Sequence, residues 1–378
     1  MIPRTVYEAE HELFRDTVHR FLEAEAAPYH EQWEKDGQVS RELWLKAGEQ
    51  GFLCPTVGQE YGGLGCDFRY NAIIDEAVGA TGLSGIGWGL HSDIVAPYIE
   101  HYGSEEQKKH WLPKMVSGEV ITAIAMSEPG AGSDLQGIKT TAVRDGDDWI
   151  LNGSKIFITN GYMADMTIVV AKTDPKAGAK GTSLFLVPAE TEGFEKGNKL
   201  QKVGMKAQDT AELFFNECRL PADALLGEEG MGFVYLMQEL PQERLNIALS
   251  AAAGCVSVVK QTTEYTKERQ AFNQSVFDFQ NTQFELAEMN AQADAMQVFI
   301  DRCLELHIKG ELDVPTAAKA KLLSTDLQCQ IIDRCVQLHG GYGYMWEYPV
   351  ARAYADARVQ RIYGGSNEVM KLIIARSL

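Results

Sequence analysis

Hydrophobic residues in the first third of the chain recur at helical spacing within otherwise polar sequence. One such set comprises Leu13, Phe14, Val18, Phe21 and Leu22. This spacing predicts a helix with one buried face. A second helix is predicted over 41–50, with Gly51 just past its end, and Ser104 with Gln107 forms a capping-box pattern that starts another. We therefore expect an N-terminal helical domain over residues 1–120.

Between residues 121 and 229 the pattern changes to short segments in which apolar and polar residues alternate. Residues 140–144 and 149–159 flank Asp145-Gly146, a dipeptide that favours tight turns, so they predict a β-hairpin. Further short apolar runs, each typical of a strand, lie at 166–171, 183–188 and 211–215. This region is therefore predicted to form a small β domain.

From residue 230 onward the apolar positions again follow a helical period. Long helices are predicted over 233–266, 279–309 and 316–338, each with one apolar stripe, which suits a helical bundle. Pro241 lies inside the first of these, and it should kink that helix or end it and start another. We expect residues 230–378 to form a C-terminal bundle, and the fold class is α+β.

Composition narrows the classes of partner. The chain has 378 residues, of which 45% are hydrophobic, and this is enough for two or three structural units with a large core. The formal net charge of −18 argues against nucleic acid or an anionic membrane surface as the main partner. No apolar run reaches about 18 residues, so no membrane span is expected.

The cysteines and the first residues bear on the cellular compartment. The 7 cysteines are scattered, with no C-x-x-C pair, and no histidines cluster at metal-ligand spacing. We expect reduced, buried thiols and no metal site. The first four residues, Met-Ile-Pro-Arg, lack a signal-peptide pattern. The expected location is cytoplasmic.

Two segments in the middle of the chain carry candidate chemistry. Residues 124–134 run from an apolar strand into a turn rich in Gly, Pro and Ser, which exposes backbone N–H groups and small hydroxyls. Residues 152–160 alternate as a half-buried strand does, which would place Phe157 and Thr159 on one face. An aromatic wall beside a hydroxyl suits a flat aromatic cofactor with polar edges. The alternative is an ordinary glycine-rich loop between strands.

Five motifs give the chain a family resemblance. They are Ser-Glu-Pro-Gly-Ala-Gly-Ser-Asp at 127–134, Phe-Ile-Thr-Asn-Gly at 157–161, Glu-Arg-Gln-Ala-Phe at 268–272, Gln-Leu-His-Gly-Gly at 337–341 and Tyr-Gly-Gly-Ser-Asn-Glu at 363–368. With these motifs the chain closely resembles the acyl-CoA dehydrogenase family from about residue 5 to its end. The resemblance implies an N-terminal helical domain, a middle β-barrel-like domain and a C-terminal four-helix bundle. It also implies one FAD per subunit and a homotetramer built as a dimer of dimers.

The resemblance also implies where the catalytic base lies. Such enzymes need a carboxylate at the α carbon of an acyl-CoA thioester, and many members carry it in a Tyr-Glu-Gly motif. Here the corresponding residues are Tyr363, Gly364 and Gly365, and glycine cannot abstract a proton. A smaller branch, which includes the long-chain and isovaleryl enzymes, carries the base on the bundle helix, where this chain has Glu243. Desolvation should raise the pKa of such a base. The alternative is that Glu243 pairs with a basic neighbour on an exposed helix face.

Further substrate contacts follow from the same resemblance. The backbone N–H of Gly364 matches a donor to the thioester oxygen, and the second donor is a hydroxyl of the FAD ribityl chain. Such donors stabilise the charge that develops on that oxygen. Arg244 resembles a residue near the adenine and phosphate end of CoA, although it could instead be a surface charge or part of an intrahelix pair. Ser133 matches the substrate-side turn, and Tyr363 and Gly365 flank the donor.

The cofactor contacts implied by the resemblance fall into three groups. Those at the flavin ring and pyrophosphate are Ile124, Met126, Ser127, Gly132, Ser133, Phe157 and Thr159, with Phe157 where many relatives have Trp. Those that reach FAD across a subunit boundary are Arg269, Phe272, Phe279, Gln280, Gln337 and Gly341. Those on the adenosine side are Ser366 and Glu368, at the start of the last helix, where N–H groups favour phosphate. Glu368 could equally be an ordinary first-turn carboxylate.

The implied reaction is FAD-dependent α,β-dehydrogenation of an acyl-CoA to the trans-2-enoyl-CoA, with electrons passed to an electron-transfer flavoprotein. One rival is a flavin oxidase or monooxygenase of the same fold. Another is a non-catalytic flavoprotein subunit that completes a neighbour's site. Gly364 leaves more room near the reacting carbons than a Glu would, which favours a branched or bulky acyl group, although Glu243 fills part of that space.

Overall fold

The N-terminal part of the chain is helical, as its apolar spacing predicts. The computed structural model describes residues 2–378. The first helices are α1 (Ala9–Phe21), α2 (His30–Asp36), α3 (Arg41–Glu49), α4 (Arg69–Thr81), α5 (Ala96–Tyr102) and α6 (Glu105–Ser117). The capping box that starts α6 is present: the Ser104 hydroxyl accepts from the Gln107 N–H, and the Gln107 side chain accepts from the Ser104 N–H.

The prediction for the buried face of α1 is wrong at one position. Leu13 is 69% exposed, whereas Val18 and Leu22 are fully buried. The buried stripe runs through His11, Val18 and Leu22, which are spaced at nearly whole helical turns, and Leu13 lies off that stripe. The observed stripe therefore begins at His11, whereas the predicted stripe began at Leu13.

The middle of the chain forms one mixed sheet. Its strands are β1 (Thr122–Ala125), β2 (Thr141–Asp145), β3 (Asp148–Thr159), β4 (Met166–Lys172), β5 (Thr182–Pro188), β6 (Phe194–Lys199), β7 (Thr210–Leu220) and β8 (Leu225–Leu226). They lie in the order β6-β7-β3-β2-β4-β5-β8, and β1 pairs with β4 in parallel. The predicted hairpin is confirmed, because β2 and β3 are antiparallel and Asp145 faces Asp148 across the turn.

A bulge in β3 breaks the alternation expected near its end. The register against β7 shifts between Lys155 and Ile158, and Phe157 has a φ of +63°. The bulge interrupts regular alternation, yet Ile158 is buried between the exposed Phe157 and the half-buried Thr159, so one shared face for Phe157 and Thr159 stays a prediction. Phe157 is 66% exposed.

The C-terminal part consists of long helices. They are α7 (Gly232–Glu268), α8 (Gln280–Ile308), α9 (Val314–His339), α10 (Pro349–Ala357) and α11 (Asn367–Ala375), and a two-stranded ribbon of β9 (Gln270–Ala271) and β10 (Gln274–Ser275) joins α7 to α8. Helix α7 runs on through Pro241, so of the two expected effects of this proline the end of the helix is wrong and a kink stays a prediction. The α+β class, with helices on either side of the middle sheet in sequence, is confirmed.

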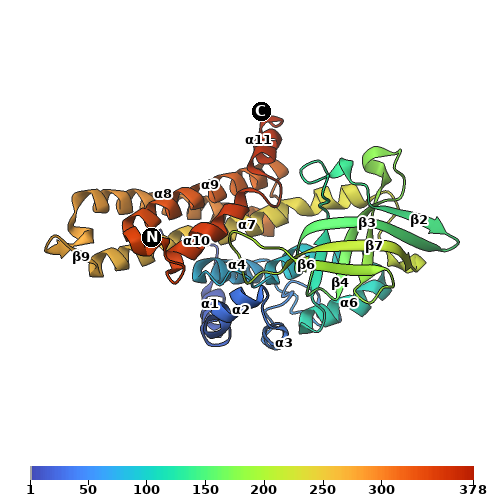
Figure 1. Cartoon of the computed structure of the whole chain (residues 1–378), viewed down its shortest axis with the longest axis horizontal. Coiled ribbons are helices and arrows are strands. Elements are labelled where there is room, and N and C mark those ends of the chain that lie inside the picture. The colour runs from blue at the N-terminus through green and yellow to red at the C-terminus, as the bar shows by residue number, and fades with distance from the viewer. Residues whose placement is uncertain (1) are drawn as a thin grey trace.

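Helix α4 fastens the N-terminal helices to α7, and the two helices lie side by side in Figure 1. At Gly79 the backbones come so close that a Cβ would lie 2.5 Å from the Ser250 carbonyl oxygen. The Ser250 hydroxyl donates to the Asp75 carbonyl at 3.2 Å, and the Ser257 hydroxyl donates to the Ala80 carbonyl at 2.6 Å. Helix α7, which carries Glu243, is thus held from the N-terminal side as well.

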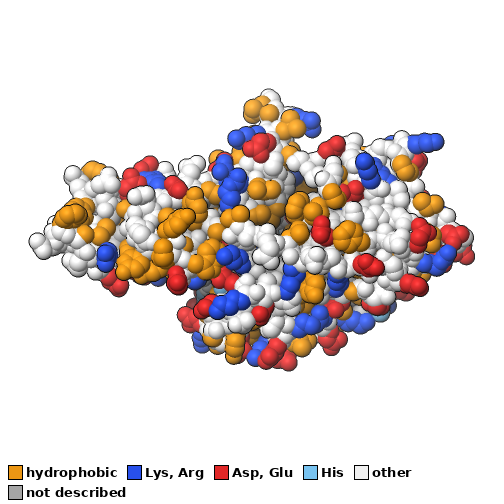
Figure 2. Space-filling view, viewed as in Figure 1, with side chains coloured by type: hydrophobic (Ala, Val, Ile, Leu, Met, Phe, Trp, Pro, Cys, Tyr) orange, Lys and Arg blue, Asp and Glu red, His pale blue; other side chains and the backbone are white. Residues whose placement is uncertain are grey.

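Hydrophobic side chains gather on part of the surface. Figure 2 shows them over the half of this face where Figure 1 places the C-terminal helices, while charged side chains crowd the lower edge. Exposed large hydrophobic side chains within 342–362 are Tyr342, Tyr344, Met345, Tyr354 and Ile362. Apolar surface of this kind is typical of a protein–protein contact.

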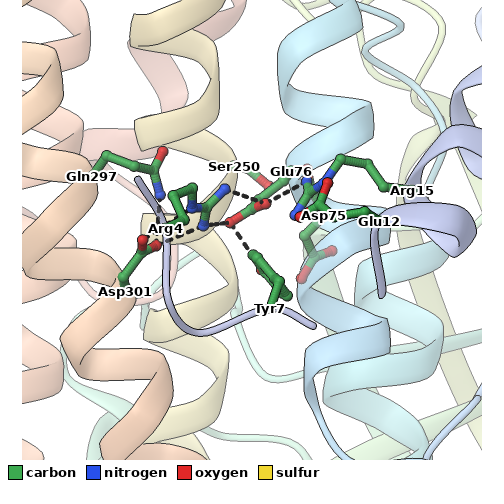
Figure 3. A network of polar contacts seen from close by, with 9 residues as sticks. All are labelled: Arg4, Tyr7, Glu12, Arg15, Asp75, Glu76, Ser250, Gln297 and Asp301. Carbon is green, nitrogen blue, oxygen red and sulfur yellow. Dashed lines mark hydrogen bonds and ion pairs between the residues drawn. The ribbon is translucent and has the colours of Figure 1, made fainter. Parts of the chain in front are cut away.

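A buried ion network anchors the segment that precedes α1 (Figure 3). The Arg4 guanidinium donates to both oxygens of Glu76 on α4 and to both oxygens of Asp301 on α8. Arg15 donates to Glu76 at 2.7 Å, and the Tyr7 hydroxyl donates to it at 3.1 Å. Burial opposes ionisation of Glu76, but the hydrogen bonds and charges of the two arginines outweigh it and lower the pKa of the carboxyl.

The Glu76 network predicts a stability effect. Glu76→Gln removes the charge that faces two arginines, so we expect it to lower the free energy of unfolding by about 3 kcal/mol, read from urea denaturation at neutral pH. The pKa of Glu76 is lowered below 4.5. The difference in stability between wild type and Glu76→Gln should therefore shrink as the pH falls through the pKa of Glu76 in the folded protein. Glu31→Gln, in the exposed pair with Lys35, is the control and should leave stability nearly unchanged, because solvent screens an exposed pair. Equal effects of the two variants would contradict this role.

Candidate active site

Glu243 lies inside the protein on α7. The residue is 5% exposed, and one carboxylate oxygen, Oε1, accepts a hydrogen bond of 2.9 Å from the Tyr98 hydroxyl on α5. Burial raises the pKa of Glu243 to about 7, against the hydrogen bond from Tyr98 and the charge of Arg244, which both lower it. The alternative of a carboxylate on an exposed helix face is therefore wrong. A carboxyl group with this pKa is suited to proton transfer near neutral pH.

A second buried carboxylate lies one turn before Glu243 on the same helix. Glu239 accepts hydrogen bonds from His101 at 2.9 Å and from the Tyr102 hydroxyl at 2.6 Å. Its hydrogen bond raises the pKa of His101, and its negative charge contributes to the raised pKa of Glu243. This turn of α7 therefore carries two carboxylates, but only Glu239 has a histidine partner.

Arg244 is also buried, with an exposed fraction of 4%. Burial lowers the pKa of its guanidinium, and the neighbouring Glu243 charge opposes that effect. Its Nε has no hydrogen-bond partner among the described residues. The alternative of a surface charge is wrong. A buried cation with an unused donor has capacity for an anionic or carbonyl group of a ligand.

The loop at Gly364 packs against the next turn of α7. Gly364 has a φ of +62°, and a Cβ at this position would lie 2.4 Å from Cδ1 of Ile247. Ile247 is one helical turn beyond Glu243, so the loop and the carboxylate belong to one region of the fold. The room that glycine was expected to leave here is taken by Ile247, which removes that argument for a branched or bulky acyl group.

A buried lysine fixes this loop. Lys321 on α9 donates through Nζ to the Gly365 carbonyl at 2.8 Å and to the Asn367 side chain at 2.9 Å. Its burial lowers the pKa of the amine to about 8. Lys321 therefore holds this turn at Gly365 and at Asn367, and Gly364 directly precedes the first of these two contacts. Tyr363, which precedes it, is half-buried.

The start of α11 follows directly. The Ser366 hydroxyl accepts from the Val369 N–H at 3.4 Å and caps the helix. Glu368 is exposed in the first turn, where its own backbone N–H and then the Ser366 hydroxyl lower the pKa of its carboxyl. These contacts are compatible with an ordinary first-turn carboxylate, and the adenosine-side role of Glu368 stays a prediction.

A second buried lysine fixes the turn after β1. Lys155 on β3 donates to Glu128 at 2.8 Å and to the Met126 carbonyl at 3.1 Å. The Glu128 carboxylate also accepts from the backbone N–H groups of Lys139 and Thr140. The ion pair thus closes the loop that contains Ser127, Gly132 and Ser133 onto β3.

The surface beside this turn is suited to a flat ligand. Ile156 donates from its backbone to the Ser127 carbonyl at 3.0 Å, so the turn lies next to the exposed Phe157 ring. Ile124 is buried beneath it, whereas Met126 and Thr159 are half-buried. At Gly130 and Gly132 a Cβ would meet nothing within 4 Å, which leaves the backbone open to a ligand. An aromatic face beside open backbone N–H groups fits a flavin ring and its phosphates.

Six further candidate cofactor residues lie around the end of the molecule that carries β9. Figure 1 places β9 at one end and β2 and β3 at the other. The distant group comprises Arg269, Phe272, Phe279, Gln280, Gln337 and Gly341, and an open hollow of about 540 Å³ lies beside Arg269, Gln337 and Gly341. Phe272 is 90% exposed and meets Phe279 edge to face at 6.1 Å. One chain does not bring the two groups together.

Sequence reasoning missed three residues that hold the site. Tyr98, Lys155 and Lys321 are all buried and each contacts a segment that the motifs did identify. The sequence gives one hint of the two lysines, because each carries a positive charge within a largely apolar segment. It gives no hint of the role of Tyr98. Among residues 2–378, no group of three or more His, Cys, Asp or Glu is arranged to hold a metal ion, and no helix has both the length and the apolar character that a membrane crossing requires.

Comparison with known proteins covers almost the whole chain. Three family models match: "Acyl-CoA dehydrogenase, N-terminal domain" at 8–119, "Acyl-CoA dehydrogenase, middle domain" at 123–218 and "Acyl-CoA dehydrogenase, C-terminal domain" at 230–378. The long-chain specific acyl-CoA dehydrogenase, mitochondrial, of Sus scrofa is 54% identical over 377 residues, which are 99% of this chain and 88% of that protein.

Two solved structures show the same fold. An acyl-CoA dehydrogenase from Geobacillus kaustophilus superposes with a TM-score of 0.98 at 51% identity and covers 99% of both chains. A glutaryl-CoA dehydrogenase from Mycobacterium smegmatis, solved in complex with FADH2, has a TM-score of 0.92 at 30% identity and covers 98% of this chain and 95% of its own.

The Lys155–Glu128 pair predicts the cost of opening the turn after β1. Lys155→Met leaves a buried carboxylate without its cation, so we expect a loss of about 3–5 kcal/mol, measured as a lower midpoint of thermal or urea unfolding. Adding Glu128→Gln removes the unpaired charge and should recover part of the loss. Lys139→Met, an exposed lysine in the same loop, is the control. A Lys155→Met protein as stable as the Lys139→Met protein would contradict a stabilising role of the Lys155–Glu128 pair.

Proposed function

Because this chain belongs to the acyl-CoA dehydrogenase family, we propose that it catalyses FAD-dependent α,β-dehydrogenation of an acyl-CoA thioester to the trans-2-enoyl-CoA. The family inferred from the five motifs is confirmed. The observation that carries the proposal is the buried Glu243 carboxylate, one turn of α7 from the side chain that packs on Gly364. A base and a backbone donor thus lie in one region.

Glu243 acts as the base that takes the α proton. Its pKa of about 7 leaves a substantial fraction ionised at neutral pH while keeping the carboxylate basic enough to accept a proton. Tyr98 occupies Oε1, and the hydrogen bonds of the described residues leave Oε2 without a donor. Oε2 is therefore the oxygen that receives the proton.

The loop at Gly364 stabilises the charge that develops on the thioester oxygen. In this proposal its backbone N–H donates to that oxygen, and Lys321 keeps the loop in place through the Gly365 carbonyl. Arg244 supplies the buried guanidinium for the polar part of acyl-CoA. Ser133, Tyr363 and Gly365 complete the substrate contacts.

Residues from the middle part of the chain and from the start of α11 fit FAD. In this proposal Met126, Ser127, Phe157 and Thr159 border the flavin ring, and the open backbone at Gly132 and Ser133 approaches the pyrophosphate. When bound, FAD supplies the acceptor for the β hydride. The adenosine side falls to Ser366 and Glu368.

A second subunit completes the cofactor site in this proposal. Strand β9, which adjoins Arg269 and Phe272, lies at the other end of the molecule from β3, which carries Phe157, so this group would reach the FAD of a neighbour. The exposed hydrophobic side chains within 342–362 support self-association, for which we propose the homotetramer, a dimer of dimers. Electrons would leave to an electron-transfer flavoprotein. All seven cysteines are free thiols. The cytoplasmic location stays a prediction.

The two rival functions are less well supported. A non-catalytic subunit has no need of a base with a pKa near neutrality, which Glu243 has. A flavin oxidase or monooxygenase that does not use a thioester would not need the thioester donor that this proposal assigns to the Gly364 loop, which Lys321 holds in place. Slow reoxidation in air of protein reduced by acyl-CoA separates the dehydrogenase from the oxidase.

For the acyl group we propose a long straight chain. The support is the 54% identity to a long-chain specific enzyme over 99% of this chain. The argument for a bulky group at Gly364 has gone, because Ile247 fills that space.

Substitution of Glu243 tests the base. We expect Glu243→Gln to slow anaerobic bleaching of bound flavin by saturating acyl-CoA by about 10²–10⁴-fold, because the amide cannot take the α proton. Glu264→Gln, an exposed glutamate on the same helix, should bleach at the wild-type rate. Near wild-type bleaching by Glu243→Gln would show that another group is the base.

Chain length tests the substrate class. We expect kcat/KM for palmitoyl-CoA to exceed that for butyryl-CoA by at least about tenfold, since each buried CH₂ contributes about 0.8 kcal/mol. The assay is the initial rate with an artificial electron acceptor under matched conditions. Equal values, or a preference for butyryl-CoA or a branched acyl-CoA, would contradict the long-chain assignment.

A further inference from the structure

The Tyr98 hydroxyl is the one donor that reaches the Glu243 carboxylate among the hydrogen bonds of residues 2–378. It donates to Oε1 at 2.9 Å, and no hydrogen bond reaches Oε2. Tyr98 is fully buried on α5, and the bond joins residues 145 positions apart. The carboxylate is therefore held by an element of the N-terminal helical part rather than by its own helix.

We propose that Tyr98 is a positioning residue of the dehydrogenation, whose hydroxyl fixes Oε1 of Glu243 and leaves Oε2 free to take the α proton. This inference rests on the proposed function, since it assigns Glu243 the role of base. A carboxylate held by one oxygen keeps a single orientation, and proton abstraction depends steeply on such alignment.

The hydroxyl can only donate under working conditions. Burial, followed by the charge of Glu243, raises the pKa of Tyr98 well above its ordinary value, so the phenol keeps its proton. A carboxylate that accepts this bond is favoured over the protonated acid. Tyr98 therefore sets both the direction of the carboxylate and the pH at which it becomes a base.

Three other features set that pH. Burial disfavours the ionised form most strongly, Arg244 from the same helix favours it, and Glu239, one turn earlier on α7, disfavours it. Tyr98 and Glu239 thus act in opposite directions on one carboxylate. Removing either should move the pH profile, and the two movements should have opposite sign.

The test compares pH profiles of flavin reduction for the FAD-loaded protein. In Tyr98→Phe, which keeps the ring and removes only the hydroxyl, we expect the acidic limb to move to higher pH by about one pH unit, which lowers the rate below that limb by about tenfold. At high pH, where Glu243 is ionised in both proteins, the rate should rise towards wild type but stay below it, because the carboxylate is no longer held in one orientation. Glu239→Gln should move the limb to lower pH.

A matched control separates this role from a loss of packing. Tyr61 is another buried tyrosine of the helical part whose hydroxyl bonds to a glutamate, Glu105. Tyr61→Phe should leave the acidic limb where it is in wild type. If Tyr98→Phe leaves the acidic limb in place, or reaches the full wild-type rate at high pH, the positioning role is overturned.

A readout without substrate separates failure of this inference from failure of the proposed function. Infrared difference spectra of the carboxyl C=O band, assigned by its loss in Glu243→Gln, report the protonation of Glu243 directly. The band should titrate at higher pH in Tyr98→Phe than in wild type. An unmoved band, with Glu243→Gln inactive, overturns only the role of Tyr98, whereas full activity of Glu243→Gln overturns the base itself.

Discussion

The structure depends on keeping one carboxylate in the interior of a largely apolar helical assembly. Burying an ionisable group disfavours its charged form, and for Glu243 this effect exceeds the help it receives from Tyr98 and Arg244. The outcome is a carboxyl with a pKa near neutrality. Helix α7 is packed by α4 and contacted by α5, and these contacts help to keep Glu243 away from water.

Buried ionisable side chains also hold the two loops of the site. Lys155 and Lys321 are buried cations, and each donates to backbone carbonyls as well as to a side chain. A buried amine is costly unless it is fully hydrogen-bonded, so each lysine forces its loop into one conformation. The turn after β1 stays open to a ligand, because a Cβ at Gly130 or Gly132 would meet nothing within 4 Å.

Much of the fold could be read from the sequence, because it rests on local patterns. The helical periods, the Asp145-Gly146 hairpin and the capping box at Ser104 each act over a few residues, and all are present. The exposure of Leu13 and the bulge near Phe157 were not predicted, for a shared reason. The line of a buried stripe and the position of a bulge are set by distant partners, which local spacing does not encode.

The site divides in the same way. The motifs located Glu243, the turn at 127–134 and the loop at 363–368, whereas the contacts that hold them come from residues far away in sequence. Tyr98 meets Glu243 across 145 residues and Lys321 meets Gly365 across 44. Ile247 shows the same limit: glycine at 364 suggested free space, and only the packing of α7 shows that it is filled.

The most direct test of the account is a crystal structure of the protein with FAD and a thioester analogue that cannot be dehydrogenated. The account predicts Oε2 of Glu243 within about 3–3.5 Å of the α carbon and the Gly364 N–H on the thioester oxygen. A Glu243 carboxylate turned away from the α carbon, with another group in its place, would contradict it.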